Sequence, residues 1–224
     1  AFGEAAARAR AAGFDAVEIH GAHSYLVDQF ISGASNKRTD EYGGDIHGRS
    51  RFMMEVIEAA RTATEPDFPV WVRVNGREYG VKGGTTLEEG IEVARHAEEA
   101  GSVAIHVSAY GPATPTNMTT ATFKPSVIRP LVTAIKQEVS VPVIAVGRIT
   151  AQAGEALLVE GGADLIAMGK GLLADPEIPN KVAGGHEDDI VPCIVCMYCR
   201  DALRRPHMSG IRCQVNPRLG SDHE

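Results

Sequence analysis

The stretch that decides the fold is PVWVRVNG, residues 69–76. It is short, rich in valine and opened by proline, which is typical of a buried β-strand. Its alternation sets three valines on one face and Trp71, Arg73 and Asn75 on the other. Four more stretches are similarly short and apolar, and the sequence predicts a strand in each of them: 14–21, 102–109, 141–148 and 163–170.

Longer stretches with helical patterns flank and separate these strands. They cover residues 1–12, 48–64, 86–100, 127–139 and 150–160. Thr86 and Glu89 form a capping-box pattern, and Gly101 lies where the helix over 86–100 should end. Strands that alternate with helices at this spacing predict parallel βα units, either in a doubly wound sheet or in a (β/α)8 barrel.

The residues at the carboxyl ends of the strands favour the α/β TIM barrel. Small and polar residues gather there, as expected for a barrel, and no Gly-x-Gly-x-x-Gly pattern follows any strand. A barrel has eight strands, so we expect this chain to carry the last five βα units and to be a fragment of a longer protein. The strand-end residues are His20, Arg73, Asn75, Ser108, Gly147, Arg148, Gly169 and Lys170.

Composition excludes several classes of protein. The 224 residues are 44% hydrophobic and carry a net charge of −7, and no basic stripe suggests a nucleic-acid partner. No run approaches the ~20 apolar residues of a membrane span, and the first residues do not resemble a signal peptide. All four cysteines lie between Cys193 and Cys213, which predicts a cytoplasmic metal or redox site instead of a secreted disulfide scaffold.

The first candidate site follows the strand over 14–21. His20 ends this strand, and His23 and Tyr25 follow in the loop. Two imidazoles could bind a carbonyl or phenolate oxygen, and the phenol could donate a proton. Alternatively, both histidines are satisfied polar residues and Tyr25 only packs. A zinc site is disfavoured because no third ligand has suitable spacing.

Two further sites carry positive charge. Arg73 in the strand over 69–76 must face a partner, either an acidic side chain or an electron-rich cofactor ring. The strand ends VGRIT and MGKGLLADP pair glycines with a basic residue, which favours phosphate binding over plain tight turns. The residues concerned are Gly147, Arg148, Gly169 and Lys170.

The cysteines form the most specific motif. Cys193, Cys196 and Cys199 make a C-x2-C-x2-C run, and Cys213 stands apart. This spacing favours an iron–sulfur cluster. A zinc site, which usually has two separated C-x2-C pairs, and unrelated thiols remain alternatives.

Together these motifs resemble the old yellow enzyme family of flavin oxidoreductases. The terminal cysteines are similar to those of its larger branch, which includes 2,4-dienoyl-CoA reductase and trimethylamine dehydrogenase. The resemblance covers nearly the whole chain. It rests on the segments FDAVEIHGAHSYLVDQFISGASNKRTDEYGGDIHGRSRF, PVIAVGRIT, ADLIAMGKGLLADPEIPNKV and CIVCMYC…CQVNPR.

The resemblance implies roles for individual residues. His20 and His23 would hold the substrate oxygen, Tyr25 would protonate the α-carbon, and Arg73 would face the pyrimidine ring of FMN. The implied reaction is hydride transfer from reduced FMN to the β-carbon of an activated alkene. The FMN phosphate would lie against Gly147, Arg148, Gly169 and Lys170, and a 4Fe-4S cluster would be held by Cys193, Cys196, Cys199 and Cys213.

The sequence departs from the family pattern in three places. Lys170 replaces the usual arginine, and the spacing from Cys199 to Cys213 differs slightly among relatives. The loop over 108–123 lacks the carboxylate of the amine dehydrogenases and the histidine of dienoyl-CoA reductase. The favoured interpretation is an alkene reductase acting on a CoA thioester or a steroid-like enone. The alternatives are an amine dehydrogenase, against which the missing carboxylate counts, and a non-catalytic metal-binding fragment.

The resemblance also implies a domain organisation. We expect residues 1–188 to form the C-terminal portion of an FMN-binding barrel. Residues 189–224 would form the iron–sulfur segment, leading towards a domain that binds FAD and NAD(P)H. The expected partner is a small molecule with an activated alkene, with no nucleic acid or membrane, and a homo-oligomer is left open.

Overall fold

The computed structural model describes residues 1–111, 128–203 and 210–220, and its centre is one sheet of five parallel strands. Each strand lies within a predicted stretch or overruns it by one or two residues, so all five predictions are confirmed. The strands are β1 (Val17–Gly21), β2 (Val70–Glu78), β3 (Ile105–Tyr110), β4 (Val143–Val146) and β5 (Leu165–Ala167).

The order of the strands decides between the two architectures. Neighbours in the sheet follow the chain order β1-β2-β3-β4-β5, and every pair is parallel. A doubly wound sheet would reverse its order at a switch point, whereas a barrel adds each strand beside the last. The fold is therefore the expected α/β TIM-barrel type, here with five βα units and with β1 and β5 at the edges of the described sheet.

Five of the helices match the predicted ones. Their bounds are α1 (Phe2–Ala11), α3 (Ile46–Thr62), α4 (Leu87–Glu99), α5 (Arg129–Lys136) and α6 (Ala151–Val159). The Thr86–Glu89 capping box at the start of α4 is present in both directions. Gly101 ends that segment at φ +91°, where a Cβ would also collide with the Arg61 guanidinium.

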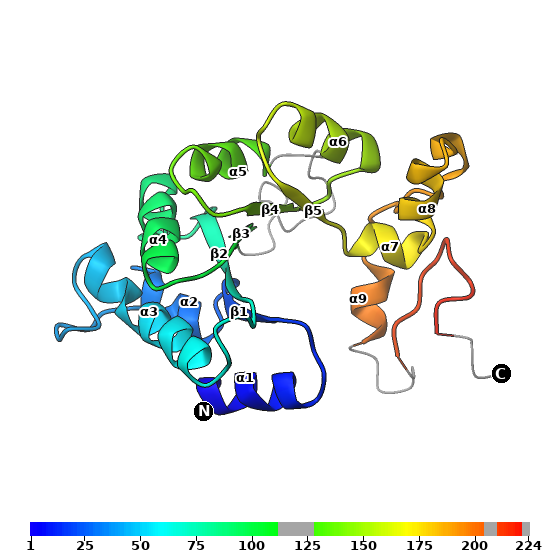
Figure 1. Ribbon diagram of the computed structural model, residues 1–224. Coiled ribbons are helices and arrows are strands. Elements are labelled where there is room, and N and C mark those ends of the chain that lie inside the picture. Colours follow the sequence, from blue (N-terminus) through cyan, green and yellow to red (C-terminus); the bar gives the residue numbers. More distant parts are fainter. Residues whose placement is uncertain (112–127, 204–209, 221–224) are drawn as a thin grey trace.

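The sequence did not predict the short helices. They have at most six residues, too few to show a helical period. They are α2 (Leu26–Ile31), α7 (Lys170–Ala174), α8 (Ile178–Ala183), the 3-10 turn η1 (Glu187–Asp189) and α9 (Tyr198–Ala202). Figure 1 shows α7, α8 and α9 beyond β5, away from the arc of helices α3 to α6.

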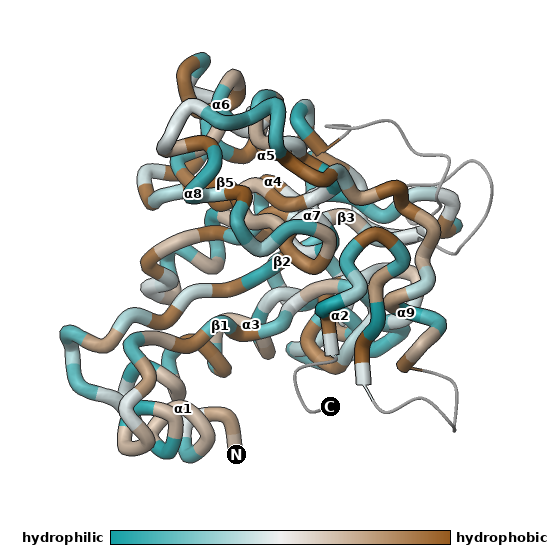
Figure 2. Tube along the Cα trace, turned by 90° about the vertical axis from the view of Figure 1, so that its right-hand side faces the viewer, coloured by the Kyte–Doolittle hydropathy of each residue, from teal (hydrophilic) through white to brown (hydrophobic). Residues whose placement is uncertain are grey.

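The hydrophobic core lies between the sheet and the longer helices outside it, α1 and α3 to α6. Val70, Val72 and Val74 of β2 are at most 1% exposed, as the alternation predicts. Burying each such side chain contributes about 1.5–3 kcal/mol before entropy is counted. The outer helices alternate between hydrophobic and hydrophilic segments along the tube (Figure 2), so that one side of each can face the valines.

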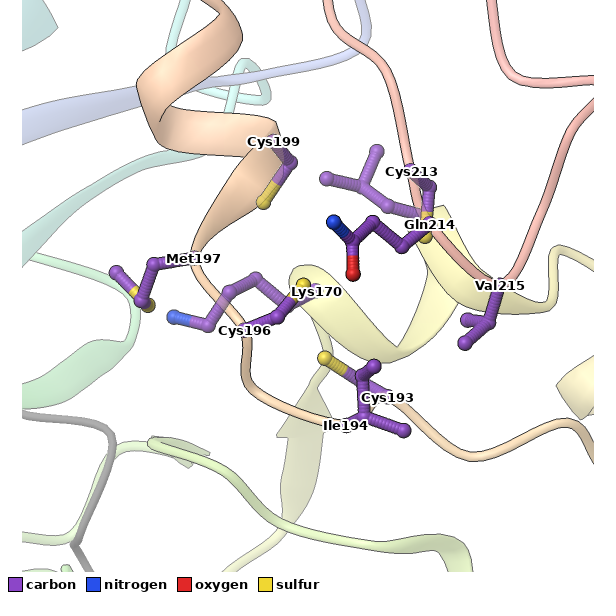
Figure 3. A pocket seen from close by; sticks show the side chains of 10 residues that line it. Lys170, Cys193, Ile194, Cys196, Met197, Cys199, Cys213, Gln214 and Val215 are labelled. Carbon is purple, nitrogen blue, oxygen red and sulfur yellow. The ribbon is translucent and has the colours of Figure 1, made fainter.

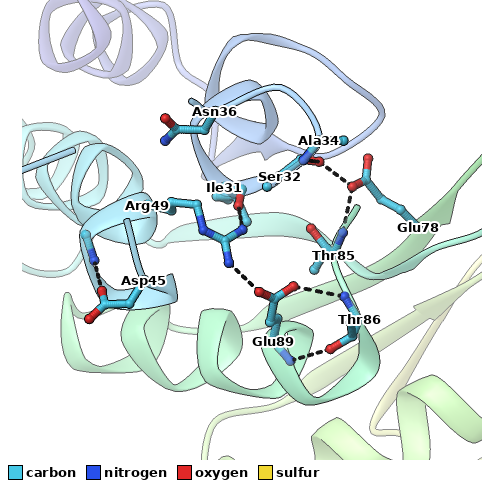
Figure 4. A network of polar contacts seen from close by, with 12 residues as sticks. Ile31, Ser32, Ala34, Asn36, Asp45, Arg49, Glu78, Thr85, Thr86 and Glu89 are labelled. Atoms are coloured by element: carbon cyan, nitrogen blue, oxygen red, sulfur yellow. Dashed lines mark hydrogen bonds and ion pairs between the residues drawn. The ribbon is translucent and has the colours of Figure 1, made fainter. Parts of the chain in front are cut away.

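A polar network fixes α2, α3 and α4 relative to one another (Figure 4). Arg49 of α3 is buried, donates to the Ile31 carbonyl at the end of α2, and pairs with Glu89 of α4. Nearby, the buried Glu78 carboxylate accepts from Ser32 Oγ at 2.5 Å and from the Thr85 N–H at 2.8 Å. Because buried charges need such partners, the network holds the end of α2 against the sheet.

The opposite face of the sheet, here called the inner face, is polar. Parallel register sets His20, Arg73 and His106 in one row across β1, β2 and β3. Asn75 and Ser108 form the next row towards the carboxyl ends. The candidate residues therefore share one face at one end of the sheet. Within the described residues, no helix is long and apolar enough to cross a membrane.

Candidate active site

The two histidines and the tyrosine come together, as the sequence predicts. The ring centroids of His20 and His23 lie 5.1 Å apart, and those of His20 and Tyr25 also lie 5.1 Å apart. Tyr25 is 62% exposed at the N-cap of α2. The cluster thus offers two imidazoles beside a phenol that solvent or a ligand can reach.

The loop that carries these groups has an unusual backbone. His23 and Ser24 have φ of 61° and 64°, a left-handed conformation that non-glycine residues rarely adopt. Asp28 holds the turn, because its Oδ2 accepts from the Ser24 N–H at 2.6 Å. Gln29 Nε2 adds a bond to the Ser24 carbonyl at 2.9 Å. Such strain persists only where the surroundings fix it, and it is common at functional sites.

Asp28 itself was not predicted from the sequence. It is 1% exposed, and its Oδ2 also accepts from Asn75 Nδ2 at 2.9 Å. Burial raises the pKa of Asp28 to about 7, and nearby Glu78 adds to the rise, although the bonds from Ser24 and Asn75 oppose it. A buried acid within the apolar run LVDQFI was the one available signal.

Both histidines are neutral at pH 7. Burial, followed by the positive charge of Arg73, lowers the pKa of His20. The same two causes, with His20 and His106 adding to them, lower the pKa of His23 to about 4. A neutral imidazole has one N–H donor and one acceptor nitrogen. The pair can therefore donate to a substrate oxygen without presenting two fixed positive charges.

Arg73 has no acidic partner within hydrogen-bond distance among the described residues. Its Nη2 donates to Ser108 Oγ at 3.3 Å, and its Nε is buried without a partner. Burial lowers the pKa of Arg73, and Glu18 opposes this from further away. A partly buried guanidinium with an unused donor suits an anionic or electron-rich ligand, the second of the two partners considered from the sequence.

Glu18 is occupied elsewhere on the inner face. Its Oε2 accepts from Trp71 Nε1 at 2.7 Å and lies 2.6 Å from His106 Nδ1. Burial works to raise the pKa of Glu18, but the bonds from His106 and Trp71 outweigh it and lower the pKa. The carboxylate therefore stays ionised near Arg73 without forming an ion pair with it.

The two glycine turns also lie side by side. Val146 and Ala167, the last residues of β4 and β5, are register partners, so both turns leave the sheet at one level. Gly147 has φ of 137°, a conformation that favours glycine, and Arg148 follows in the left-handed region. At Gly169 a Cβ would meet no atom within 4 Å, so the backbone is open to a close ligand. These features fit a phosphate group.

All four cysteines line one small pocket (Figure 3). They are free thiols from α9, the loop before it and the segment around Cys213. In the loop before α9, Val195 and Met197 lie between successive cysteines, and both have a left-handed backbone conformation. The other lining residues are Lys170, Leu173, Ile194, Met197, Gln214 and Val215.

The donor set of this pocket is four free thiols, the ligand type of iron–sulfur clusters and of structural zinc sites alike. Within the described residues, no three His, Cys, Asp or Glu side chains are close enough to hold one metal ion. Lys170 also lines this pocket, where Figure 3 shows its side chain extending towards Met197.

Part of the loop over residues 108–123 lies outside the described residues. The loop over 108–123, which lacks an acid or a histidine, continues through residues 112–127, of which nothing is described here. The choice of substrate suggested by that loop therefore stays a prediction.

Comparison with known proteins gives a consistent picture. The model of the NADH:flavin oxidoreductase / NADH oxidase family matches residues 1–189. A metal reductase of Desulforamulus reducens is 43% identical over 100% of this chain and 33% of its own length. An NADH oxidase of Thermoanaerobacter brockii is 41% identical over 99% and 34%, and a cinnamate reductase of Clostridium sporogenes is 36% identical over 100% and 36%. The chain thus spans about a third of these relatives.

Solved structures are similar over the same extent. A 2-naphthoyl-CoA reductase superposes with a TM-score of 0.89 at 29% identity, over 98% of this chain and 34% of that one. The 6-hydroxypseudooxynicotine amine oxidase of Pseudomonas geniculata gives 0.87 at 31% identity, over 99% and 33%. The likeness extends through the cysteine segment, because almost all of this chain is covered in both.

Proposed function

The chain belongs to the NADH:flavin oxidoreductase / NADH oxidase family, and from this premise we propose that it is part of an FMN- and 4Fe-4S-dependent enzyme that uses NAD(P)H to reduce an activated C=C bond. The family membership confirms the resemblance drawn from the sequence. The proposal goes further in naming FMN, the cluster and the reaction. One observation carries it: two neutral histidines and an exposed tyrosine stand beside an arginine that forms no ion pair with any described residue.

The residues of the inner face would divide the work. Arg73 would bind the pyrimidine side of FMN, and the glycine turns with Arg148 would bind its phosphate, whereas the Lys170 side chain, predicted for the same role, lines the cysteine pocket. When bound, FMN supplies the hydride. His20 and His23 would donate hydrogen bonds to the substrate carbonyl as negative charge builds on its oxygen, and Tyr25 would protonate the α-carbon.

The cysteine segment would serve as an electron-transfer station. Cys193, Cys196, Cys199 and Cys213 would hold the cluster, and the end of the family match at residue 189 supports a boundary between barrel and segment there. We further propose that the whole protein continues into a domain for FAD and NAD(P)H, works in the cytoplasm and takes a small-molecule substrate. The relatives' greater length supports the additional domain.

The direction of the reaction is supported by two named relatives. A cinnamate reductase and a 2-naphthoyl-CoA reductase both act, by name, on unsaturated acids or their thioesters. The likeness to an amine oxidase favours amine oxidation as the second candidate. Against it stands the lack of a carboxylate in the loop over 108–123.

Anaerobic turnover separates these candidates. In one assay, the protein is mixed with NADH or NADPH and an α,β-unsaturated acid or thioester. In the other, it is mixed with a primary or tertiary amine and an electron acceptor. We expect NAD(P)H to be oxidised in the presence of the alkene, and we expect the amine not to be consumed in its own assay. Amine turnover alone would establish the second candidate, and a protein that binds no flavin would be the non-catalytic fragment.

A further inference from the structure

Ser108 joins the two parts of the proposed site. Its Oγ lies 2.7 Å from His23 Nε2 and 3.3 Å from Arg73 Nη2. It stands on β3, is 6% exposed and is the register partner of Asn75 on β2. Within the described residues, the side-chain hydroxyl makes only these two hydrogen bonds.

The direction of both bonds follows from elementary chemistry. A guanidinium has donors and no acceptor, so Ser108 Oγ must accept from Arg73. Among the described residues, the single hydroxyl proton then has one acceptor in reach, His23 Nε2. If His23 donated from Nε2 instead, two donors would point at the oxygen and the buried hydroxyl proton would have no partner, which is costly.

We propose that Ser108 is a positioning residue that fixes His23 in its Nδ1–H tautomer, so that Nδ1–H is the donor offered to the substrate oxygen. The inference rests on the proposed function in its last clause alone, because the tautomer follows from the protein contacts. Neutral His23 is required, and burial beside Arg73 lowers its pKa to about 4.

The other ring nitrogen is placed to make this useful. Within the described residues, His23 Nδ1 has no hydrogen-bond partner, so it is the ring nitrogen left for a substrate oxygen. The left-handed backbone of His23 and the Ser24–Asp28 bond hold the ring against Ser108. With the opposite tautomer, Nδ1 would present a lone pair to the substrate oxygen and repel it.

The bridge also links His23 to Arg73. The guanidinium polarises the Ser108 hydroxyl, which strengthens its bond to Nε2, because hydrogen bonds in a chain reinforce one another. The sequence marks Ser108 only as a residue at a strand end, and the pairing of β1, β2 and β3 brings it to His23 and Arg73. With Ser108 on β3, the residues that position the site would come from β1, β2 and β3 instead of from β1 and β2.

The test is the tautomer itself. Protein labelled with 15N-histidine is compared as wild type, Ser108→Ala and Ser108→Thr, and the His23 signals are assigned by their loss in His23→Gln. The 15N shifts of Nδ1 and Nε2 report which nitrogen carries the proton. Thermal unfolding of each variant shows whether it is folded.

We expect wild type and Ser108→Thr to hold the Nδ1–H form. In Ser108→Ala, the ratio of Nδ1–H to Nε2–H should fall about tenfold, the effect of losing a hydrogen bond of ~1.4 kcal/mol. An Nε2–H wild type, or a folded Ser108→Ala protein with an unchanged ratio, would overturn the inference. The readout needs no turnover, so a confirmed tautomer in a protein without alkene activity would count against the proposed function alone.

Discussion

His20 and Arg73 are register partners in the parallel pair β1 and β2, so their side chains stand next to each other on the inner face. The guanidinium charge, after burial, lowers the pKa of His20 and keeps it neutral. The arrangement sets one permanent positive charge beside two neutral donors. It suits a site in which an electron-rich ring and a carbonyl oxygen are bound side by side.

The first prediction concerns His20. Replacing it with alanine removes one of the two donors to the developing oxyanion, which usually lowers kcat by about 10²- to 10³-fold. Steady-state reduction of an α,β-unsaturated acid or thioester measures the loss. His186→Ala, a change after α8, is the control. Equal activity of the two variants would remove His20 from the mechanism.

A second prediction separates proton transfer from binding. Tyr25→Phe keeps the ring and removes the exposed hydroxyl, so alkene turnover should fall about a hundredfold or more while the reduction of bound flavin by NAD(P)H is unchanged. Stopped-flow spectroscopy follows the two half-reactions separately. Tyr42→Phe is a matched control, because among the described residues the Tyr42 hydroxyl bonds only to Glu55, at the surface. Loss of both half-reactions in Tyr25→Phe would contradict its role as proton donor.

Arg73 should matter for the cofactor before any chemistry occurs. Arg73→Ala removes charge-assisted hydrogen bonds worth about 1.5–3 kcal/mol, which corresponds to roughly 10- to 100-fold weaker FMN binding. Quenching of FMN fluorescence gives the dissociation constant. Arg95→Ala, which removes two exposed ion pairs, with Glu92 and Glu138, should leave the dissociation constant unchanged. Equal affinities of both variants would show that Arg73 does not face the flavin.

The raised pKa of Asp28 should make the free energy of unfolding depend on pH. Its pKa rises from 3.8 to about 7 in the folded protein, so the folded state holds a proton that the unfolded state has released. Between these values the free energy of unfolding falls as pH rises, by up to about 4 kcal/mol from this group. Above pH 7 the loss is complete, and below pH 3.8 it is absent.

Asp28→Asn is the informative variant, because the amide keeps an oxygen for the Ser24 N–H and cannot ionise. Urea unfolding from pH 4 to pH 8 should give a flatter profile for this variant than for wild type. Parallel profiles would mean that Asp28 is ionised throughout and that Asn75 and Ser24 compensate its charge.

Much of this site follows from the sequence alone. The five strands have short apolar patterns that can be read from neighbouring residues alone, and polar residues lie at their carboxyl ends. His20, His23 and Tyr25 were predicted together and lie together. The Thr86–Glu89 capping box was predicted and is present, because its two hydrogen bonds are local to four residues.

What the sequence could not provide depends on contacts between distant residues. Ser108 is 85 positions from His23, and only strand pairing brings the two within 2.7 Å. Asp28 is close to Ser24 in the chain, yet its raised pKa comes from burial of α2 against the sheet, and its second partner, Asn75, lies on β2. The place of Lys170 on the wall of the cysteine pocket likewise depends on how the C-terminal segment folds back against α7.

The most direct test of the account is the cofactor content of the protein purified without oxygen. Visible spectra and metal analysis of wild type should give roughly four irons per chain with broad absorbance, together with bound FMN. Cys213→Ala, which removes one of the four ligands, should lose the iron and its absorbance and keep the FMN. A wild-type protein that holds zinc, and neither iron nor flavin, would contradict the central claim.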